Sequence, residues 1–144
     1  MLELAKKNKV KSGASSAEFI EAQITSIPLA DSIADTIISN CVINLVPEVE
    51  KQQVFNEISR LLKPGGRVAI SDILAKHPLP ENVRKSAAAH VGCVAGASLV
   101  SQYQDYLRQA GLNGKSSDLE PQYICRLDEI INIMLRYFNH RRRR

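Results

Sequence analysis

The segment from residue 35 to residue 74 constrains the fold more than any other part of the sequence. It begins with an apolar run, DTIISNCVINLV (residues 35–46), continues with a helical periodicity, and ends after a Pro-Gly-Gly turn with a second apolar run (residues 68–74). Near-continuous apolarity is typical of strands covered on both faces of a parallel sheet, and strand, helix and strand in this order form a βαβ unit. The sequence therefore predicts an α/β fold.

The helix between these two strands is predicted over residues 47–62. Its apolar residues recur with a period near 3.6, which indicates a helix buried along one wide stripe. Pro47 suits the first turn, where a missing N–H is not needed. The stripe consists of Val49, Val54, Phe55, Ile58, Leu61 and Leu62.

Further elements are predicted on both sides of this unit. Before it, an exposed amphipathic helix ends at Gly13, and residues 17–25 (AEFIEAQIT) have the composition of a short strand. After it, residues 81–97 are rich in alanine and helical in pattern. A helix over residues 100–112 places one apolar face inward, with Val100, Tyr103, Leu107 and Ala110 on it.

The chain of 144 residues is long enough for one domain with a single hydrophobic core. The pattern that supports this domain ends near residue 112. Residues 113–144 are therefore assigned to a linker, a terminal helix over residues 127–138 and a basic tail of unknown role.

Charge and cysteine content exclude several classes of function. Of the 19 basic residues, four form the arginine tail at residues 141–144, and the remaining 15 balance the 15 acidic residues. A short tail without a basic stripe or interleaved aromatic residues does not indicate nucleic-acid binding. No apolar run approaches the roughly 20 residues that span a bilayer, so no membrane insertion is expected. Three widely spaced cysteines without a signal peptide indicate a reducing compartment, and we expect a cytoplasmic protein.

Asn40 and Cys41 stand side by side in the first apolar run, which otherwise has the pattern of a core strand. A cysteine in such a run is usually a small buried hydrophobe, and Cys93 admits the same interpretation. The residues alone leave open whether either thiol has a function.

Three stretches carry a resemblance to a known family. They are IISNCVINLVPEVEKQQVFNEISRLLKPGGRVAISDIL, LPENVRKSAAAHVGCVAGA and VSQYQDYLRQAGL, and they resemble the arsenite methyltransferase family, which uses S-adenosylmethionine. The LKPGG segment before a strand occurs throughout class I methyltransferases and by itself indicates only that superfamily. The specific part is SNCVINL together with VGCVAGA, because two cysteines lie in matching contexts at matching separation. The resemblance extends from residue 1 to residue 112.

This resemblance implies a fold and a set of site residues. The fold is a Rossmann-like sheet with flanking helices, in which S-adenosylmethionine lies across the carboxyl ends of the strands. Cys41 and Cys93 correspond to the two thiols that bind arsenite or thiol-bound trivalent arsenic. Asn40, Ile24 and Thr25 correspond to positions near the cofactor, and a thiol reductant is implied as a further partner.

The chemistry of arsenic fits these residue types. Trivalent arsenic is soft and thiophilic, so thiolates hold it where carboxylates would not. Its lone pair then stays free to attack the methyl group of the sulfonium cofactor. Catalysis would consist mostly of positioning, because the cofactor carries the difficult chemistry.

Two departures from the family limit what can be expected of this chain. The glycine-rich loop that cradles the methionine part of the cofactor is missing, together with the first two strands of the family's sheet, whose order is 3-2-1-4-5-7-6. Thr25 also stands where the family places an acidic residue beside the adenine. Without the missing strands, the strand at residues 35–46 is left with an open edge, which favours self-association and low stability.

Three functions follow as alternatives. The first is methyl transfer from S-adenosylmethionine to cysteine-bound arsenic, impaired or absent in this truncated chain. The second is a thiol-based metalloid-binding module without catalysis. The third is an incomplete gene product without a function of its own.

Overall fold

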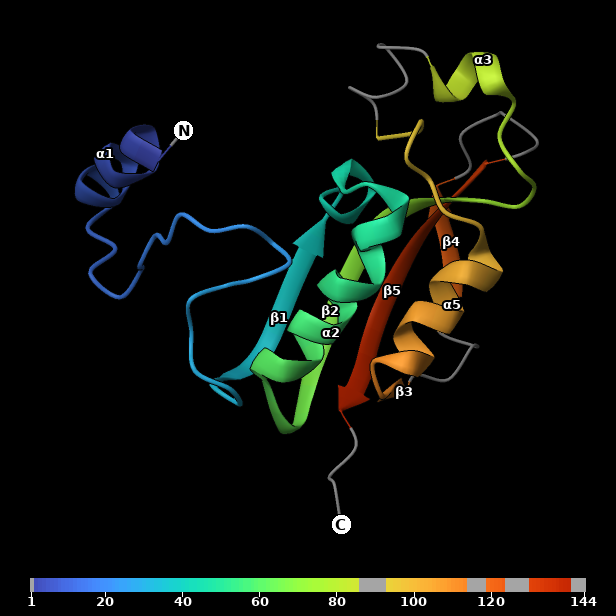
Figure 1. The fold of residues 1–144 in the computed structure, drawn as a ribbon. Helices are drawn as coiled ribbons and strands as arrows, with labels where there is room; N and C mark the ends of the chain where they lie inside the picture. The colour runs from blue at the N-terminus through green and yellow to red at the C-terminus, as the bar shows by residue number, and fades with distance from the viewer. Residues whose placement is uncertain (1, 86–92, 114–118, 124–129, 141–144) are drawn as a thin grey trace.

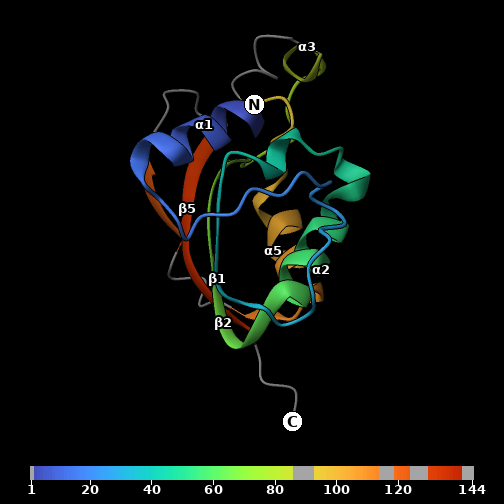
Figure 2. The same cartoon turned by 90° about the vertical axis from the view of Figure 1, so that its left-hand side faces the viewer.

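A computed structural model of the chain describes residues 2–85, 93–113, 119–123 and 130–140. Its centre is a sheet in the order β1-β2-β5-β3, with β4 also paired to β5 (Figure 1). The strands are β1 (Ala34–Asn40), β2 (Leu62–Ala75), β3 (Leu112–Asn113), β4 (Leu119–Tyr123) and β5 (Ile130–His140). The helices α2 (Lys51–Leu61) and α5 (Val100–Gln109) lie together on one face of this sheet (Figure 2).

The βαβ unit predicted from the sequence is present. β1 and β2 are parallel, with Ile37 opposite Val68 and Asn40 opposite Ser71. Two short 3-10 helices, η1 (Ile43–Leu45) and η2 (Glu48–Glu50), lead from β1 into α2. The crossover brings the residues after β1 and the residues after β2 to the same edge of the sheet, where ligands of open α/β sheets bind.

The apolar stripe of α2 packs against β2 and α5, as its periodicity predicts. Val54, Phe55 and Ile58 are buried, and the ring of Phe55 meets that of Tyr103 edge-on at a centroid distance of 4.9 Å. Val49 is the exception: its side chain is 87% exposed, because it lies in η2, before the α-helix begins.

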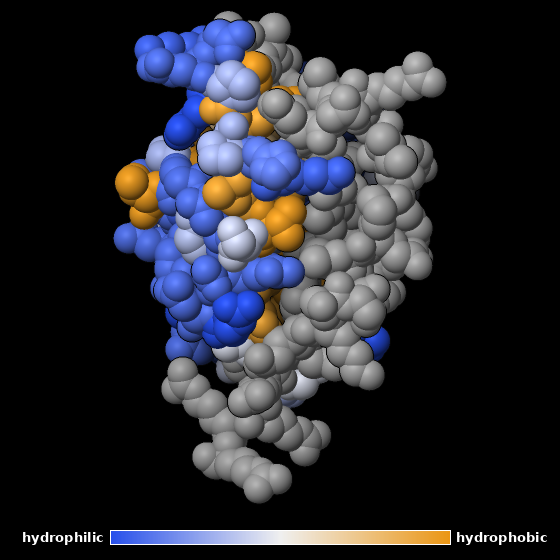
Figure 3. All heavy atoms as spheres, turned by 90° about the vertical axis from the view of Figure 1, so that its right-hand side faces the viewer, coloured by the Kyte–Doolittle hydropathy of each residue, from blue (hydrophilic) through white to orange (hydrophobic). Residues whose placement is uncertain are grey.

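The exposed positions of α5 are polar. On this side of the molecule, hydrophilic residues cover most of the coloured surface, and an apolar strip runs beside them (Figure 3). Tyr103 and Leu107 point into the core, as predicted. Gly111 follows the helix with φ +76°, and Gly13 follows α1 (Leu2–Ser12) with φ +65°. Both glycines adopt the left-handed conformation that ends helices, which confirms the two helix ends inferred from the sequence.

β1 is less buried than its apolar sequence predicts. It is an edge strand of the described sheet, none of its residues is fully buried, and the side chain of Ile38 is 79% exposed. The expectation of a strand covered on both faces is therefore wrong for β1. The reason is that in the described part of the chain β1 pairs only with β2, so no strand covers its other edge there.

Residues 17–25 do not form the predicted strand. Their backbone is irregular apart from an isolated bridge between Gln23 and Ser26, and the side chains of Phe19 and Ile20 are exposed. Strand propensity becomes a strand only when a neighbour supplies hydrogen-bond partners, and none of the described strands lies beside the segment.

The carboxyl-terminal segment corrects another expectation. The sequence predicts a helix over residues 127–138, whereas the structure has the long strand β5, antiparallel to β2. Strand formation satisfies the second edge of β2, and this tertiary pairing outweighs the local helical pattern. On its other side, β5 pairs antiparallel with β3 and with β4.

The Ala-rich segment is described only in part. A single helical turn, α3 (Glu81–Arg84), begins it, residues 86–92 lie outside the described residues, and residues 93–99 form turns. The boundary after residue 112 stays a prediction. Among the described helices, none is both long and apolar enough to cross a membrane.

Candidate functional site

Cys41 and Cys93 share an unusual backbone conformation. Cys41 follows the last residue of β1, where its N–H donates to the carbonyl of Ser71 at 2.8 Å, and its φ is +53°. Cys93 lies in a turn, with φ +59°. Positive φ is uncommon for residues other than glycine, and such strain gathers at functional sites.

The fold brings these two cysteines together across 52 positions of sequence. The thiol of Cys93 donates a hydrogen bond to the carbonyl oxygen of Cys41 at 3.1 Å. Both cysteines are free thiols and partly exposed, so a ligand can reach them from solvent. Asn40 lies beside them as the exposed last residue of β1.

The environment of Cys41 keeps its thiol protonated. Burial is the largest cause that raises the pKa of Cys41, followed by the negative charge of Asp72 and by the neighbouring Cys93. A protonated thiol is a poor nucleophile, so the chemistry of this site depends on a partner that displaces the proton, such as a thiophilic metalloid.

Asp72 is a buried acidic residue in β2 whose negative charge acts on Cys41. One of its oxygens accepts a hydrogen bond from the hydroxyl of Tyr103 at 3.3 Å, and the other has no hydrogen-bond partner among the described residues. Burial raises the pKa of Asp72 to about 6, although the Tyr103 hydroxyl and the charge of Lys51 act in the opposite direction. In the sequence, Asp72 follows VAIS and resembles the acidic residue that ends a strand in the family, and that resemblance leaves a structural hydrogen bond and a catalytic role equally open.

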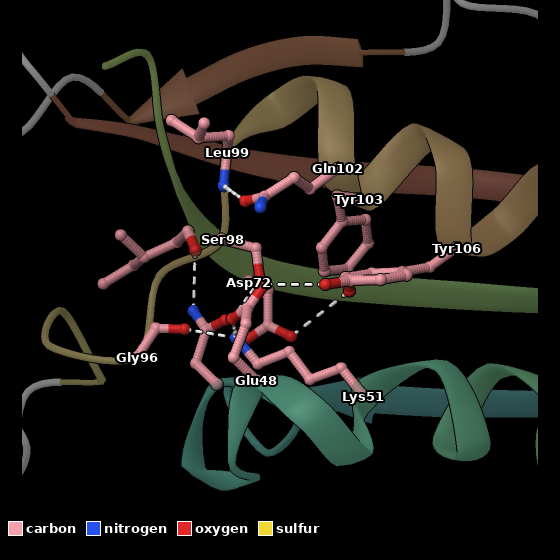
Figure 4. Close-up of polar contacts among 11 residues, drawn as sticks. Glu48, Lys51, Asp72, Gly96, Ser98, Leu99, Gln102, Tyr103 and Tyr106 are labelled. Atoms are coloured by element: carbon pink, nitrogen blue, oxygen red, sulfur yellow. Dashed lines mark hydrogen bonds and ion pairs between the residues drawn. The ribbon is translucent and has the colours of Figure 1, made fainter. Parts of the chain in front are cut away.

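A buried polar network adjoins this carboxylate (Figure 4). The side chain of Lys51 is fully buried, and its ammonium group pairs with Glu48 at 2.9 Å and donates to the hydroxyl of Ser98 at 2.7 Å and to the carbonyl of Gly96. The hydroxyl of Tyr106 donates to Glu48 at 2.7 Å. Burial raises the pKa of Glu48, but these hydrogen bonds and the charge of Lys51 outweigh it, so the pKa lies below its usual value.

Sequence reasoning did not identify Lys51, because a lysine at the start of a helix normally lies in solvent. The sequence contains only a weak indication that Lys51 is buried. Lys51 precedes the apolar stripe of α2 by one turn of helix, on the side of Val54 and Phe55. A pocket of about 570 Å³ lies beside the network and is lined by residues of η1, α2 and the 95–99 turn, without the two cysteines.

The two remaining predicted residues lie in another segment. Ile24 and Thr25 are the central residues of the turn between Gln23 and Ser26, and Ile24 packs against the core. The chain after this turn is held by α2, where Glu57 accepts from the N–H of Ile27 at 2.7 Å. The structure thus brings Asn40, Cys41 and Cys93 together. The roles of all five residues stay predictions.

Comparison with known proteins relates this arrangement to a family. A family model described as a methyltransferase domain matches residues 1–111. The arsenite methyltransferase of Halobacterium salinarum is 44% identical over 111 residues, which are 77% of this chain and 28% of that protein. The arsenite methyltransferase of Aquipseudomonas alcaligenes is 39% identical over 88 residues, which are 61% of this chain and 25% of that protein. The chain thus spans little more than a quarter of the length of these relatives.

Solved structures agree with the sequence matches. An arsenic(III) S-adenosylmethionine methyltransferase from Chlamydomonas reinhardtii aligns with a TM-score of 0.63 at 28% identity, over 87% of this chain and 44% of that chain. The YcgJ protein of a Bacillus aligns with a TM-score of 0.64 over 99% of this chain and 79% of that chain, and at 15% identity it shows the fold alone. These matches confirm the Rossmann-like α/β fold and the resemblance found in the sequence.

Proposed function

Because the chain belongs to the methyltransferase-domain family, whose model matches residues 1–111, we propose that it carries the arsenic-binding half of an S-adenosylmethionine-dependent arsenite methyltransferase. The observation that carries this proposal is the hydrogen bond from the thiol of Cys93 to the carbonyl of Cys41. It joins the two cysteines of the matched segments at the carboxyl end of β1. The relatives named as arsenite methyltransferases support arsenic as the substrate.

The chemistry of binding needs no oxidant and no other co-reactant. Arsenous acid condenses with two thiols: two arsenic–oxygen bonds break, two arsenic–sulfur bonds form, and two water molecules leave with the thiol protons. Cys41 and Cys93 are the two sulfur ligands. The arsenic keeps its lone pair, which is the nucleophile for a methyl group.

The residues present could contact only part of S-adenosylmethionine. Asn40 ends β1 at the sheet edge where such ligands bind. Thr25 offers a hydroxyl where the family has a carboxylate, and the adjacent glycines Gly65 and Gly66 belong to the irregular start of β2 rather than to a loop that could cradle the cofactor. We therefore derive no transfer step through this cofactor for the 144-residue polypeptide, and we propose that its activity alone is impaired or absent.

Calorimetric titration tests this division of the site. In the Cys125→Ser background, arsenite is expected to bind with a stoichiometry of one, whereas S-adenosylmethionine gives no binding heat. Prior alkylation of the thiols serves as the control and should abolish the arsenite signal. Tight binding of S-adenosylmethionine would contradict the half-site, and a missing arsenite signal would contradict the thiol assignment.

A metalloid-binding module without catalysis is the second candidate. It is favoured by the fact that one chain supplies both thiols. Methyl transfer in the presence of a separately expressed cofactor-binding half distinguishes the two candidates: restored turnover supports the enzyme, and arsenite binding without restored turnover supports the module.

We also propose that the protein works in the cytoplasm with a thiol reductant. Three cysteines at wide spacing support a reducing environment, in which their thiols stay free. A reductant would return them to the thiol state after any oxidation.

The open edge of β1 is proposed as a site of self-association. Ile38 and Ile33 are exposed on and beside this edge strand, with 79% and 48% of their side chains accessible. Unpaired strand edges next to apolar side chains pair with a second copy unless charges prevent it.

Sedimentation measurements should therefore show concentration-dependent oligomers that Ile38→Lys weakens by about tenfold in dissociation constant. Val49→Lys is the matched control, because Val49 is 87% exposed but lies in η2, away from the strand edge. A monomer at all concentrations, or an equal effect of both substitutions, would contradict the proposal.

A further inference from the structure

The two cysteine turns meet through residues that lie three positions after each cysteine. Asn44 follows Cys41 by three residues, and Gly96 follows Cys93 by three. A Cβ at Gly96 would overlap the carbonyl oxygen of Asn44, so the two backbones touch at a point where only glycine fits. Asn44 is itself fixed, because its side-chain amide donates to the carbonyl of Ile73 in β2 at 2.6 Å.

The segment that carries Gly96 is held in place by residues outside it. Residues 93–97 form no helix or strand, and Cys93 adopts strained backbone angles within them. Ser98 is anchored because its carbonyl accepts from the N–H of Ala75 at 2.9 Å. Between that anchor and Cys93, the ammonium group of Lys51 donates to the carbonyl of Gly96 and to the hydroxyl of Ser98.

Each N–H donor of the Lys51 ammonium group has an acceptor. An ammonium group has three N–H donors, and the described residues supply three acceptors: Glu48, Gly96 and Ser98. Burying a charge costs much free energy unless it is paired and hydrogen-bonded, and an apolar side chain would fill the same space without this cost. Lys51 thus favours the one conformation of the 96–98 segment in which its acceptors are in place (Figure 4).

We propose that Lys51 is a positioning residue for the thiol pair. Its ammonium group holds Gly96 against Asn44 and thereby fixes Cys93 beside Cys41 at a spacing that one arsenic atom can bridge. This role rests on the proposed function, in which both sulfurs bind one arsenic. Lys51 itself touches neither thiol in this arrangement and acts only through the 96–98 segment.

Thiol cross-linking tests the spacing without arsenic. Dibromobimane becomes strongly fluorescent once both of its arms have reacted with neighbouring thiols. In the Cys125→Ser background, Lys51→Met should lower the cross-linked yield by about tenfold, because the second thiol loses its high effective concentration. The total count of thiols that react with a monofunctional reagent should stay at two, and a purely structural role would not separate these two readouts.

Two further variants keep the test decisive. Ser98→Ala removes only one acceptor of Lys51 and should lower the cross-linked yield in the same direction but less, even if Lys51→Met fails to fold. Lys63→Met is the matched control, since Lys63 is 45% exposed and its ion pair with Asp35 lies at the opposite end of β1.

The outcomes separate this inference from the proposed function. Undiminished cross-linking in Lys51→Met or in Ser98→Ala would overturn the positioning role, whatever the protein does with arsenic. Equal loss in Lys63→Met would overturn it as well. If the parent chain cross-links efficiently and still binds no arsenite, the proposed function fails, while the role of Lys51 in thiol spacing is decided by the variants alone. Absence of cross-linking in the parent overturns both.

Discussion

Replacing Cys93 with serine should lower the affinity for phenylarsine oxide by about 100-fold or more, because chelation by two linked ligands exceeds single-site binding by two to four orders of magnitude. Phenylarsine oxide forms two arsenic–sulfur bonds and releases one water molecule, so it reports directly on a thiol pair. The hydrogen bond between Cys93 and the carbonyl of Cys41 places the two cysteines within reach of such a ligand. Cys41→Ser should have the same effect.

The controls for this experiment come from the chain itself. Cys125→Ser should leave the affinity unchanged, because Cys125 lies outside the residues that match the family model. The double variant Cys41→Ser, Cys93→Ser should bind more weakly than either single variant, since it also loses the single-site bond that one remaining thiol provides. Retention of full affinity in Cys93→Ser would remove the basis of the arsenic site.

Replacing Asp72 with asparagine should raise the free energy of unfolding at pH 8 by about 3 kcal/mol. The pKa of Asp72 is raised from 3.8 to about 6 in the folded chain, mainly by burial. The folded state therefore binds the proton more tightly than the unfolded state, and this contribution is fully present below pH 4 and is lost as the pH rises through 6. Asparagine does not titrate and still accepts the hydrogen bond of Tyr103.

Urea unfolding at several pH values measures this effect. The advantage of Asp72→Asn should grow between pH 4 and pH 7 and then stay constant. Asp105→Asn is the matched control: Asp105 is exposed on α5, and its ion pair with Arg108 contributes little to stability. A pH-independent difference between Asp72→Asn and the parent would show that burial does not perturb this carboxyl group. A buried carboxyl group that lowers the stability of the fold when it ionises also agrees with a functional role for Asp72.

The sequence predicts the parts of the fold that depend on local pattern. The period of the apolar residues locates α2, and two apolar runs around it locate β1 and β2. Asn40 and Cys41 lie at the end of β1, as the resemblance implied. The proximity of Cys41 and Cys93 could be expected only from the resemblance, because no local pattern relates two residues that lie 52 positions apart.

The parts that sequence reasoning missed depend on tertiary partners. Residues 130–140 have a mixed pattern, and the open edge of β2 decides that they form β5. Residues 17–25 have strand composition, but no strand among the residues that the structure describes pairs with them. Lys51 has the sequence context of a surface lysine, and its burial becomes visible only when the 96–98 segment closes over it.

The central place of β2 in the sheet also governs how fast the chain reaches this structure. Its partners are β1, separated from it by a whole crossover, and β5, whose Asn139 lies opposite Arg67. No hairpin between adjacent segments can nucleate these pairings, so large loops must close before any of them forms. Chains dominated by such distant pairings fold on the order of milliseconds to seconds, and during that interval the apolar side of β2 is available to chaperones and to neighbouring nascent chains.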